Sequence, residues 1–504
     1  GFCARLVGWL CAPTFARMGD GPIRSTTLQG AMLVALCTPL HAALETNCSV
    51  ALDDVELERP GTDYMRVANG TLADCVARCC EDPACAAFTF SSPSPISGCG
   101  LACCQLKSVA PPPVRNVHGA AVRTGVALHG VAVPGAWPVP PYPRSDFITN
   151  ISIDWATAQN SGVSGDTWPS AWAADGSAYA MGCDNKQPGH ANGTMMWMNW
   201  WRVRGNATHV DELTLLNDSP VSNSQVRTVC GAKSGGNIKP SSVIALPDGR
   251  LLAGVQCMEY YDSADPSFVG RQRALSTWLI TSTDGGKTWD TNATDHAFFG
   301  GRLTNPMFIA AGQAQSAAPD EWLYVHFPAS SAPETAYWDG NDYILLGRVR
   351  PAHVLTRSAY EFRGADGTWY GDSSMAAPVF QHRHMTGQDH TFYQPALRRY
   401  IIPNYGFVDP HTGQPVGWHN YYKVTNTAPA GQLALFESQH PWGPWSLFHL
   451  EQPWNLEGGH AAYDPDFPAQ WASTDGRTLR MISSACCGSP GYSYHATTVN
   501  VHCP

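Results

Sequence analysis

The sequence predicts an all-β protein, a five-bladed β-propeller preceded by a small disulfide-rich α+β domain. Charged residues make up only 14% of the 504 residues, while Gly (47), Pro (39) and Trp (18) are abundant. This composition is typical of many short strands joined by turns. Eight of the 17 cysteines lie between Cys48 and Cys104, which marks the small domain. After it, five prolines recur at intervals of 66 to 89 residues, each beside an apolar run, which indicates repeated blades.

Residues 1–44 have the order of a leader with a signal peptide. Met18 is followed by Arg24, by an apolar run from Gly30 to Cys37, and by the small residues Ala42 and Ala43. A short membrane anchor is the alternative, but the run is too brief to span a bilayer. No later stretch is long enough either, so we expect a secreted protein with no membrane span.

Seven N-x-S/T sequons agree with export and are predicted glycosylation sites. They are Asn47, Asn69, Asn150, Asn192, Asn206, Asn217 and Asn292. The formal net charge is −10 and no Lys/Arg run occurs, so a nucleic-acid partner is not expected.

The cysteine cluster defines a first domain at residues 45–125. Cys75 and Cys79 are four residues apart, so a helical turn over Ala73–Cys80 places both on one face, where they can join the helix to strands. Phe88 and Phe90 alternate as in a buried strand, and a further strand is expected to start at Leu106. The eight cysteines of the cluster and the six beyond it are both even sets, which predicts disulfides; a zinc site is the alternative, but paired C-x-x-C knuckles are missing.

These residues resemble the PAN/apple module. The resemblance rests on Cys75, Cys79, Cys85, Ala87-Phe88, Cys99 and Cys104-Gln-Leu-Lys107. The additional Cys80 and Cys103 depart from it and leave the pairing open. The resemblance implies a protein or glycan ligand and no catalytic apparatus. A disulfide-linked spacer is the alternative.

A Pro-rich linker at 126–145 leads to the propeller, predicted at 146–504. Each of the five prolines is expected at or just before the first strand of a blade, with a turn and a second strand after it. They are Pro169, Pro240, Pro306, Pro395 and Pro468. A pair of β-sandwiches is the competing fold.

The octapeptide Ser282–Trp289 fits the Asp-box pattern S-x-D-x-G-x-T-W at every fixed position. We expect a hairpin turn in the outer part of blade two, in which Asp284 accepts amide hydrogens two residues on, Gly285 and Gly286 take positive φ, and Trp289 folds back as an apolar plug. Such boxes resemble those of sialidase-like propellers. A sialidase is nevertheless the third choice, because this chain has one full box and no F-R-I-P-like segment before it.

Six segments in this order resemble the propeller family known as domain of unknown function 4185. They are GDTWPSAWAADGSAYAMG, STDGGKTW, YILLGRVRPAHVLTRSAYEF, YQPALRRYIIP, PWGPWS and FPAQWASTDGRTLRMISS. Some bacterial members of that family are similar to endo-acting arabinanases of glycoside hydrolase family 183. The resemblance therefore implies hydrolysis of a furanosidic polysaccharide such as arabinan.

Glycoside hydrolysis needs two carboxyl groups, one on either side of the scissile bond. The residues just before the innermost strands of a propeller lie at the mouth of its funnel, which favours Asp166 as the base. The candidates for the acid are Asp464, Asp466, Asp389 and Glu259. Each can instead be a turn or N–H cap. The Asp-Gly turns at Asp175, Asp248 and Asp475 are assigned to structure.

The predicted substrate-binding residues are Trp168, Lys239, Asn305 and His460, with Trp172 and Trp338 as further stacking walls. No cofactor is predicted, and a structural calcium or other metal stays open. His382 and His384, with Asp389 and His390, are the alternative metal set. G-x-S-x-G, Walker A and H-E-x-x-H are missing from the sequence. The second hypothesis is a propeller that binds carbohydrate without cutting it.

Overall fold

The computed structural model describes most of the chain after residue 141. It covers residues 142–185, 196–222, 229–230, 237–260, 272–331, 334–456, 460–485 and 492–503, together with separate segments of the first domain between residues 48 and 129. The predicted leader and linker residues 130–141 lie outside it. In the part of the chain that is described, no helix is both long and apolar enough to cross a membrane.

The first domain has one helix, α1 (Leu72–Glu81), and a five-stranded antiparallel sheet. The strands, in sheet order, are β1 (Cys48–Leu52), β7 (Ala121–His129), β4 (Ala87–Ser92), β5 (Cys103–Lys107) and β3 (Asp63–Ala68). A separate short pair joins β2 (Leu57–Glu58) to β6 (Val114–Arg115).

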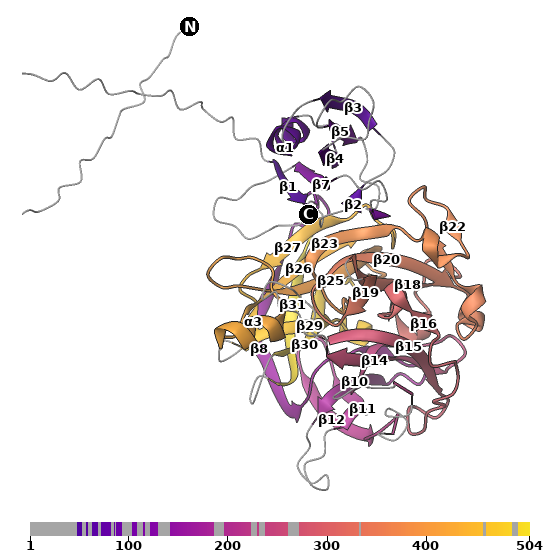
Figure 1. The fold of residues 1–504 in the computed structure, drawn as a ribbon. Coiled ribbons are helices and arrows are strands. Elements are labelled where there is room, and N and C mark those ends of the chain that lie inside the picture. Colours follow the sequence, from indigo (N-terminus) through magenta and orange to yellow (C-terminus); the bar gives the residue numbers. More distant parts are fainter. Residues whose placement is uncertain are drawn as a thin grey trace, which may run out of the picture. The chain divides into compact units, whose positions relative to one another are not determined.

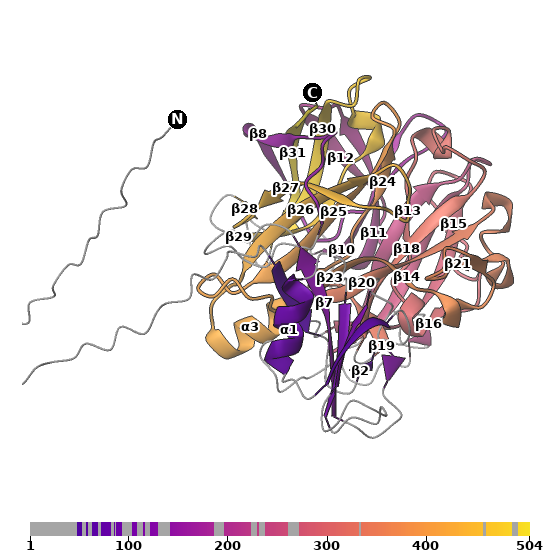
Figure 2. The ribbon, with the colours of Figure 1, turned by 90° about the horizontal axis from the view of Figure 1, so that it is seen from above.

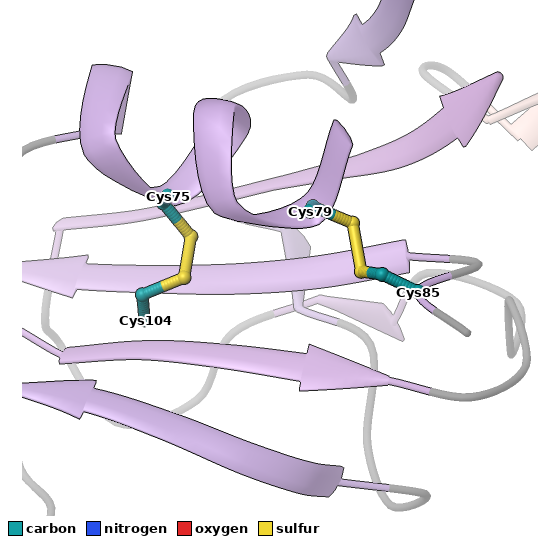
Figure 3. Close-up of a disulfide and its surroundings, with 4 residues drawn as sticks. All are labelled: Cys75, Cys79, Cys85 and Cys104. Atoms are coloured by element: carbon teal, nitrogen blue, oxygen red, sulfur yellow. A yellow bond between two sulfur atoms is a disulfide. The ribbon is translucent and has the colours of Figure 1, made fainter. Parts of the chain in front are cut away.

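Two disulfides leave the same face of α1 (Figure 3). Cys75 pairs with Cys104 of β5, and Cys79 pairs with Cys85 just before β4. Because these two helix positions are four residues apart, both sulfurs point into the core beside Phe88. The predicted helix and strand through Phe88 are confirmed. The strand expected to start at Leu106 instead ends at the next residue, since its pairing already begins at Cys103.

The second domain is a five-bladed β-propeller, as predicted (Figure 1). From the axis outward, blade one contains β9 (Ser170–Trp172), β10 (Ala178–Asn185), β11 (Met196–Gly205) and β12 (Val210–Asn217). Blade two contains β13 (Asn237–Ala245), β14 (Leu251–Tyr260), β15 (Gln272–Ser282) and β16 (Phe299–Gly300). The short β19 (Glu334–Tyr337) pairs with both β15 and blade three, so it links two neighbouring blades.

Blade three begins with β17 (Met307–Phe308), β18 (Leu323–Ser331) and β20 (Asn341–Val349). Its outer position is shared by β21 (Glu361–Arg363) and β23 (Pro378–Thr386), and β22 (Trp369–Tyr370) pairs with β21. Blade four contains β24 (Phe392–Gln394), β25 (Arg399–Val408), β26 (Ala430–Ser438) and β27 (Ser446–Glu451). Blade five contains β29 (His460–Asp466), preceded by β28 (Asn455–Leu456), then β30 (Thr478–Ala485) and β31 (Ser493–His502).

The fourth strand of blade five comes from the other end of the propeller sequence. It is β8 (Asn150–Ser164), which runs antiparallel to β31 with Ile151 opposite Val501. Both views place the magenta β8 beside the yellow β31 (Figures 1 and 2). The ring is thus closed by hydrogen bonds between the first and last strands of the propeller, which leaves no open sheet edge at the junction.

The segment just before β8 is bound to blades three and four. The Tyr142 ring stacks on Phe380 at 5.0 Å, and its hydroxyl accepts a hydrogen bond from the Gln381 amide over 2.7 Å. Ser145 Oγ donates to Glu437 over 2.6 Å. Contact with the propeller therefore already exists at Tyr142, within the segment predicted as a linker.

The five prolines mark the blades but not always the first strand. Pro169 and Pro306 directly precede β9 and β17, and Pro240 lies within β13 at a bulge. The prediction is wrong for Pro395 and Pro468, which follow β24 and β29. Pro395 begins the turn from β24 to β25, where its fixed φ is favoured and no ladder amide is required.

The Asp box lies between β15 and β16, in the outer part of blade two. Asp284 accepts the Thr288 amide, four residues on rather than the predicted two, and Ser282 Oγ accepts the Gly286 amide. Gly285 and Gly286 have φ of 74° and 84°. Trp289 packs edge-on against Trp200 of blade one at 5.1 Å, so the box fastens two blades together.

Strand alternation assigns each connection to one of two ends of the propeller. Connections from a fourth strand to the next first strand, and from second to third strands, share one end, which we call the site end. Asp166 lies in the connection from β8 to β9, and Lys239 lies at the start of β13. Both therefore lie at the site end.

Candidate functional site

Asp166 and Cys183 form an isolated antiparallel bridge at the start of blade one. Their backbones exchange two hydrogen bonds of 3.0 and 2.9 Å. The flanking residues Thr167 and Asp184 adopt left-handed φ of 45° and 52°, which is uncommon for residues with a Cβ. As a result, one donor atom each from Asp166, Cys183 and Asp184 converge within 4.8 Å of one another.

The Lys239 ammonium lies among these three side chains. Its Nζ is 2.8 Å from Asp184 Oδ2, 3.5 Å from both oxygens of Asp166, and 3.3 Å from Cys183 Sγ. Burial lowers the pKa of Lys239, but the surrounding acids outweigh burial and raise it well above its usual value. The lysine is therefore charged and balances the pair of carboxyl groups.

Asp184 is the more accessible of the two acids. Its side chain is 17% exposed, against 8% for Asp166. Burial raises the pKa of Asp184, and Lys239 only partly opposes this effect. One of its oxygens, Oδ1, has no hydrogen-bond partner. Burial thus favours the protonated form of Asp184.

Two tyrosines of blade five complete the surroundings of this pair. Tyr463 of β29 donates its hydroxyl to Asp166 Oδ2 over 3.0 Å, and Tyr492 hydrogen-bonds Asp184. Burial raises the pKa of both phenols well above the usual value, so both stay protonated. They act as neutral donors that favour the charged form of the acid they contact.

Cys183 was expected to pair in a disulfide, and this prediction is wrong. It is a free, buried thiol that donates to Asp166 Oδ1 over 2.6 Å, and burial raises its pKa well above the usual value. Cys230 does pair with Cys257. Cys503 is also free, whereas Cys486 and Cys487 lie outside the described residues.

Three of the other predicted acids form a second buried cluster around His390. Asp464 Oδ1 is 3.2 Å from His390 Nε2, and Asp389 accepts hydrogen bonds from the Asn404 side chain and the Tyr405 amide. Burial lowers the pKa of His390, but Asp464 and its neighbours outweigh burial and raise it. Burial raises the pKa of Asp389 and Asp466. Asp464 bonds to His390, whereas Asp389 bonds to Asn404 and Tyr405 and Asp466 accepts the Phe467 amide.

The remaining acid, Glu259, does not join either cluster. It pairs with Arg273 across the β14–β15 ladder of blade two. The prediction of Glu259 as the acid partner is therefore not supported by its position. Its carboxylate is held by the neighbouring strand.

Most of the predicted sugar-binding side chains are buried. Trp168 is 1% exposed and packs on Trp201 and Tyr494, and Trp338 is 4% exposed, so neither offers a face to a sugar. Asn305 is buried and bonds to Gln256 and the Tyr337 carbonyl, which makes it structural. Lys239 binds the acids as described above. Trp172 and His460 are partly exposed, and their role stays a prediction.

The alternative metal set does not assemble. His382 Nδ1 bonds to Asn404 over 2.6 Å, while His384 Nδ1 lies 3.1 Å from Asp342. Within the described ranges, the group with metal-like spacing is Asp166, Cys183 and Asp184. Lys239 already supplies the positive charge there, so these residues do not fit a resident cation.

Asp184, Cys183 and Tyr463 were not among the site residues predicted from the sequence. A signal existed for the first two: they end the apolar run of the second strand in blade one. A hairpin register that pairs Ala180 with Ser170 leads back to Thr167 opposite Cys183, and a one-residue shift in the pairing places Asp166 there instead. No local pattern identifies Tyr463, because it is 297 residues from Asp166 along the chain.

Comparison with known proteins gives one family match and several distant structural ones. Residues 57–107 match the PAN domain family. No curated protein matches the chain in sequence. A putative hydrolase from Bacteroides ovatus matches at a TM-score of 0.42 and 12% identity, covering 68% of this chain and 87% of its own.

Two arabinan-degrading proteins give similar values. The endo-arabinase from Bacteroides thetaiotaomicron has a TM-score of 0.36 and 9% identity, covering 68% of this chain and 96% of its own. The endo-1,5-alpha-L-arabinanase from Thermotoga petrophila has a TM-score of 0.38 and 10% identity, covering 68% and 73%. Likeness at this level says nothing about the chemistry of the site.

Proposed function

We propose that the protein is a glycoside hydrolase that cleaves a furanosidic polysaccharide such as arabinan, with Asp166 and Asp184 as its carboxyl pair. The observation that supports this proposal is the spacing of the two acids, whose oxygens lie within 4.8 Å at the site end. The sequence resemblance to the glycoside hydrolase family 183 propellers agrees with it. Asp184 replaces the four acid partners predicted from the sequence.

The environments of the two acids suggest different roles. Asp184 has the raised pKa and the more accessible side chain, as expected of the acid that protonates the glycosidic oxygen. Asp166 is held by Tyr463 and Lys239, which stabilise its carboxylate. Since the oxygens of the two acids lie within 4.8 Å, closer than the roughly 6.5–9.5 Å that inverting enzymes need to fit a water, Asp166 would attack the anomeric carbon rather than activate water.

A propeller that binds carbohydrate without cutting it is the second candidate. It is favoured by the low exposure of Asp166 and by the ion pairs that hold both acids to Lys239. A structural role would use the same contacts to join blades one and two. Only measured turnover separates the two functions.

The experiment is an assay of linear arabinan and related furanosidic polysaccharides with the whole protein. Asp166→Asn and Asp184→Asn are each expected to lower turnover by about 10²–10⁴-fold. Asp475→Asn, in an exposed turn of blade five, is the matched control and is expected to leave turnover unchanged. Undiminished turnover in both site variants would show that Asp166 and Asp184 are not the catalytic carboxyl pair. Retardation of wild type in an arabinan gel without any cleavage would favour the binding propeller.

We also propose where the protein acts and what its PAN domain does. We infer a secreted glycoprotein whose PAN domain binds a protein or glycan ligand. Asn150, Asn206 and Asn292 are exposed, as glycosylation requires, whereas Asn217 Nδ2 already donates to the Lys287 carbonyl. The other three sequons, at Asn47, Asn69 and Asn192, lie outside the described residues.

A further inference from the structure

Helix α3 (Trp418–Thr425) lies in the connection from β25 to β26, the second and third strands of blade four. By strand alternation, this connection belongs to the site end of the propeller (Figure 1). Its first residue is anchored there, because the Trp418 amide donates to Asp339 Oδ2 over 3.3 Å. The helix ends at Asn426, whose left-handed φ of 53° lets its amide bond to the Tyr422 carbonyl.

A row of aromatic rings connects this helix to the carboxyl pair. Tyr463, which bonds to Asp166, has its ring 5.5 Å from that of Trp338. Trp338 in turn lies 6.2 Å from His419. These contacts run through the core from blade five to blade four, and strand alternation places α3 and the acids at the same end of the propeller.

The row ends in an exposed ring. Tyr422 is 45% exposed and stacks on Trp418 at 5.3 Å with an interplanar angle of 13°. Trp418 is itself 7% exposed, so it supports one face of Tyr422 while the other faces solvent. An exposed tyrosine ring does not contribute the hydrophobic free energy that it would gain by burial. Its exposed surface is therefore available to bind a ligand.

We propose that Tyr422, supported by Trp418, is a platform that stacks on a sugar ring of the polysaccharide at a distance from the cleavage point. The apolar C–H face of an uncharged sugar matches the electron-rich face of an aromatic ring. This inference rests on the proposed function, because the polysaccharide is the molecule that reaches both the carboxyl pair and α3. It makes the enzyme dependent on a chain of several sugars.

Among the side chains that the structure describes, the other exposed large apolar ones do not offer a comparable surface. Trp155, Leu275 and Met375 lie on β8, on β15 and in the segment between β22 and β23. They come from three different blades, as isolated surface residues usually do. Trp155 is 42% exposed, which makes it a matched control for Tyr422.

The test compares Tyr422→Ala, Tyr422→Phe and Trp155→Ala in the full chain. With linear arabinan, Tyr422→Ala is expected to raise KM by about 2- to 12-fold with little change in kcat, the range typical of one lost stacking contact. Tyr422→Phe keeps the ring and is expected to behave as wild type. With a chromogenic single arabinofuranoside, which is too short to reach α3, all three variants are expected to match wild type.

Binding of uncleaved arabinan is measured in parallel by affinity electrophoresis in the Asp184→Asn background. If the wild type cleaves arabinan and Tyr422→Ala has the same KM, the proposed role of Tyr422 is wrong, while the proposed hydrolase activity stands. If arabinan binds in a way that depends on Tyr422 but is not cleaved, the proposed role of Tyr422 stands and the proposed hydrolase activity is wrong. An equal loss in Trp155→Ala, or no binding and no cleavage at all, overturns the platform.

Discussion

Lys239 Nζ lies 2.8 Å from Asp184 Oδ2, so the cation of blade two is bound to the end of the second strand of blade one. The same ammonium also reaches Asp166. Two acids at this spacing repel each other when both are charged, and one buried cation between them offsets that repulsion. This arrangement determines how the site responds to substitution and to pH.

Removal of the cation is expected to destabilise the fold. Lys239→Met leaves two buried carboxyl groups without a counter-charge, and loss of one partner from a buried ion pair typically costs about 3–5 kcal/mol. The free energy of unfolding from urea titration is the measurement. Lys287→Met, at an exposed position in the Asp box, is the control. Because Asp184→Asn removes one of the two charges, adding it to Lys239→Met should recover part of the loss. No recovery would contradict the role of charge balance.

The buried Asp339 predicts a pH dependence of stability. Burial raises its pKa from 3.8 to about 7. The folded state therefore binds this proton more tightly than the unfolded chain, so the contribution is stabilising at low pH and is lost as pH rises from about 4 to 7. At about 1.4 kcal/mol per pKa unit, the loss reaches at most about 4 kcal/mol.

The comparison that isolates this effect is wild type against Asp339→Asn, which keeps an acceptor for the Trp418 amide. Unfolding free energies measured from pH 4 to 8 should show wild type falling relative to the variant as pH rises. Parallel curves across this range would show that Asp339 does not titrate as described. His326, whose pKa burial lowers to about 4, is present in both proteins and cancels in the difference.

A substitution in the Asp box tests its role as a fastener between blades. A Cβ at Gly286 would lie 1.9 Å from Trp200 Nε1, whereas Gly249 has a similar φ of 88° and open space. Gly249→Ala is expected to cost about 1–2 kcal/mol from backbone strain alone. Gly286→Ala should cost clearly more, because Trp200 must also shift. Thermal unfolding of both variants measures the difference, and equal losses would mean that Trp200 adjusts freely.

The two free thiols in the described part of the chain, Cys183 and Cys503, should differ in reactivity. Burial raises the pKa of both thiols, but Cys183 is fully buried whereas Cys503 is partly exposed. We expect a maleimide to label Cys503 in the native protein and to label Cys183 only after denaturation. Peptide mass mapping locates the label. Rapid native labelling of Cys183 would show that the inner end of blade one opens readily.

The sequence predicted the fold more completely than it predicted the candidate site. The repeated prolines and the Asp box reflect local turn chemistry, so blades one to three were found near their true starts. Pro395 and Pro468 lie after the first strand of their blades. The local sequence does not distinguish a proline after a first strand from one before it. Asp166 was predicted because it lies shortly before a first strand, β9, and its role stays a prediction. Its partners come from β10, β13 and β29, and only the closed ring brings them together.

The pairing of β8 with β31 has a consequence for how this protein is made. The first strand of the propeller leaves the ribosome before any of its blades, and its partner is the last strand to emerge. Until then β8 has unpaired backbone groups, and Tyr463 is still missing from the side of Asp166. We expect the growing chain to need protection from aggregation over this interval, since contacts this distant in sequence form slowly. Asp166 would therefore gain its hydrogen bond from Tyr463 only late in synthesis, after most of the propeller has emerged.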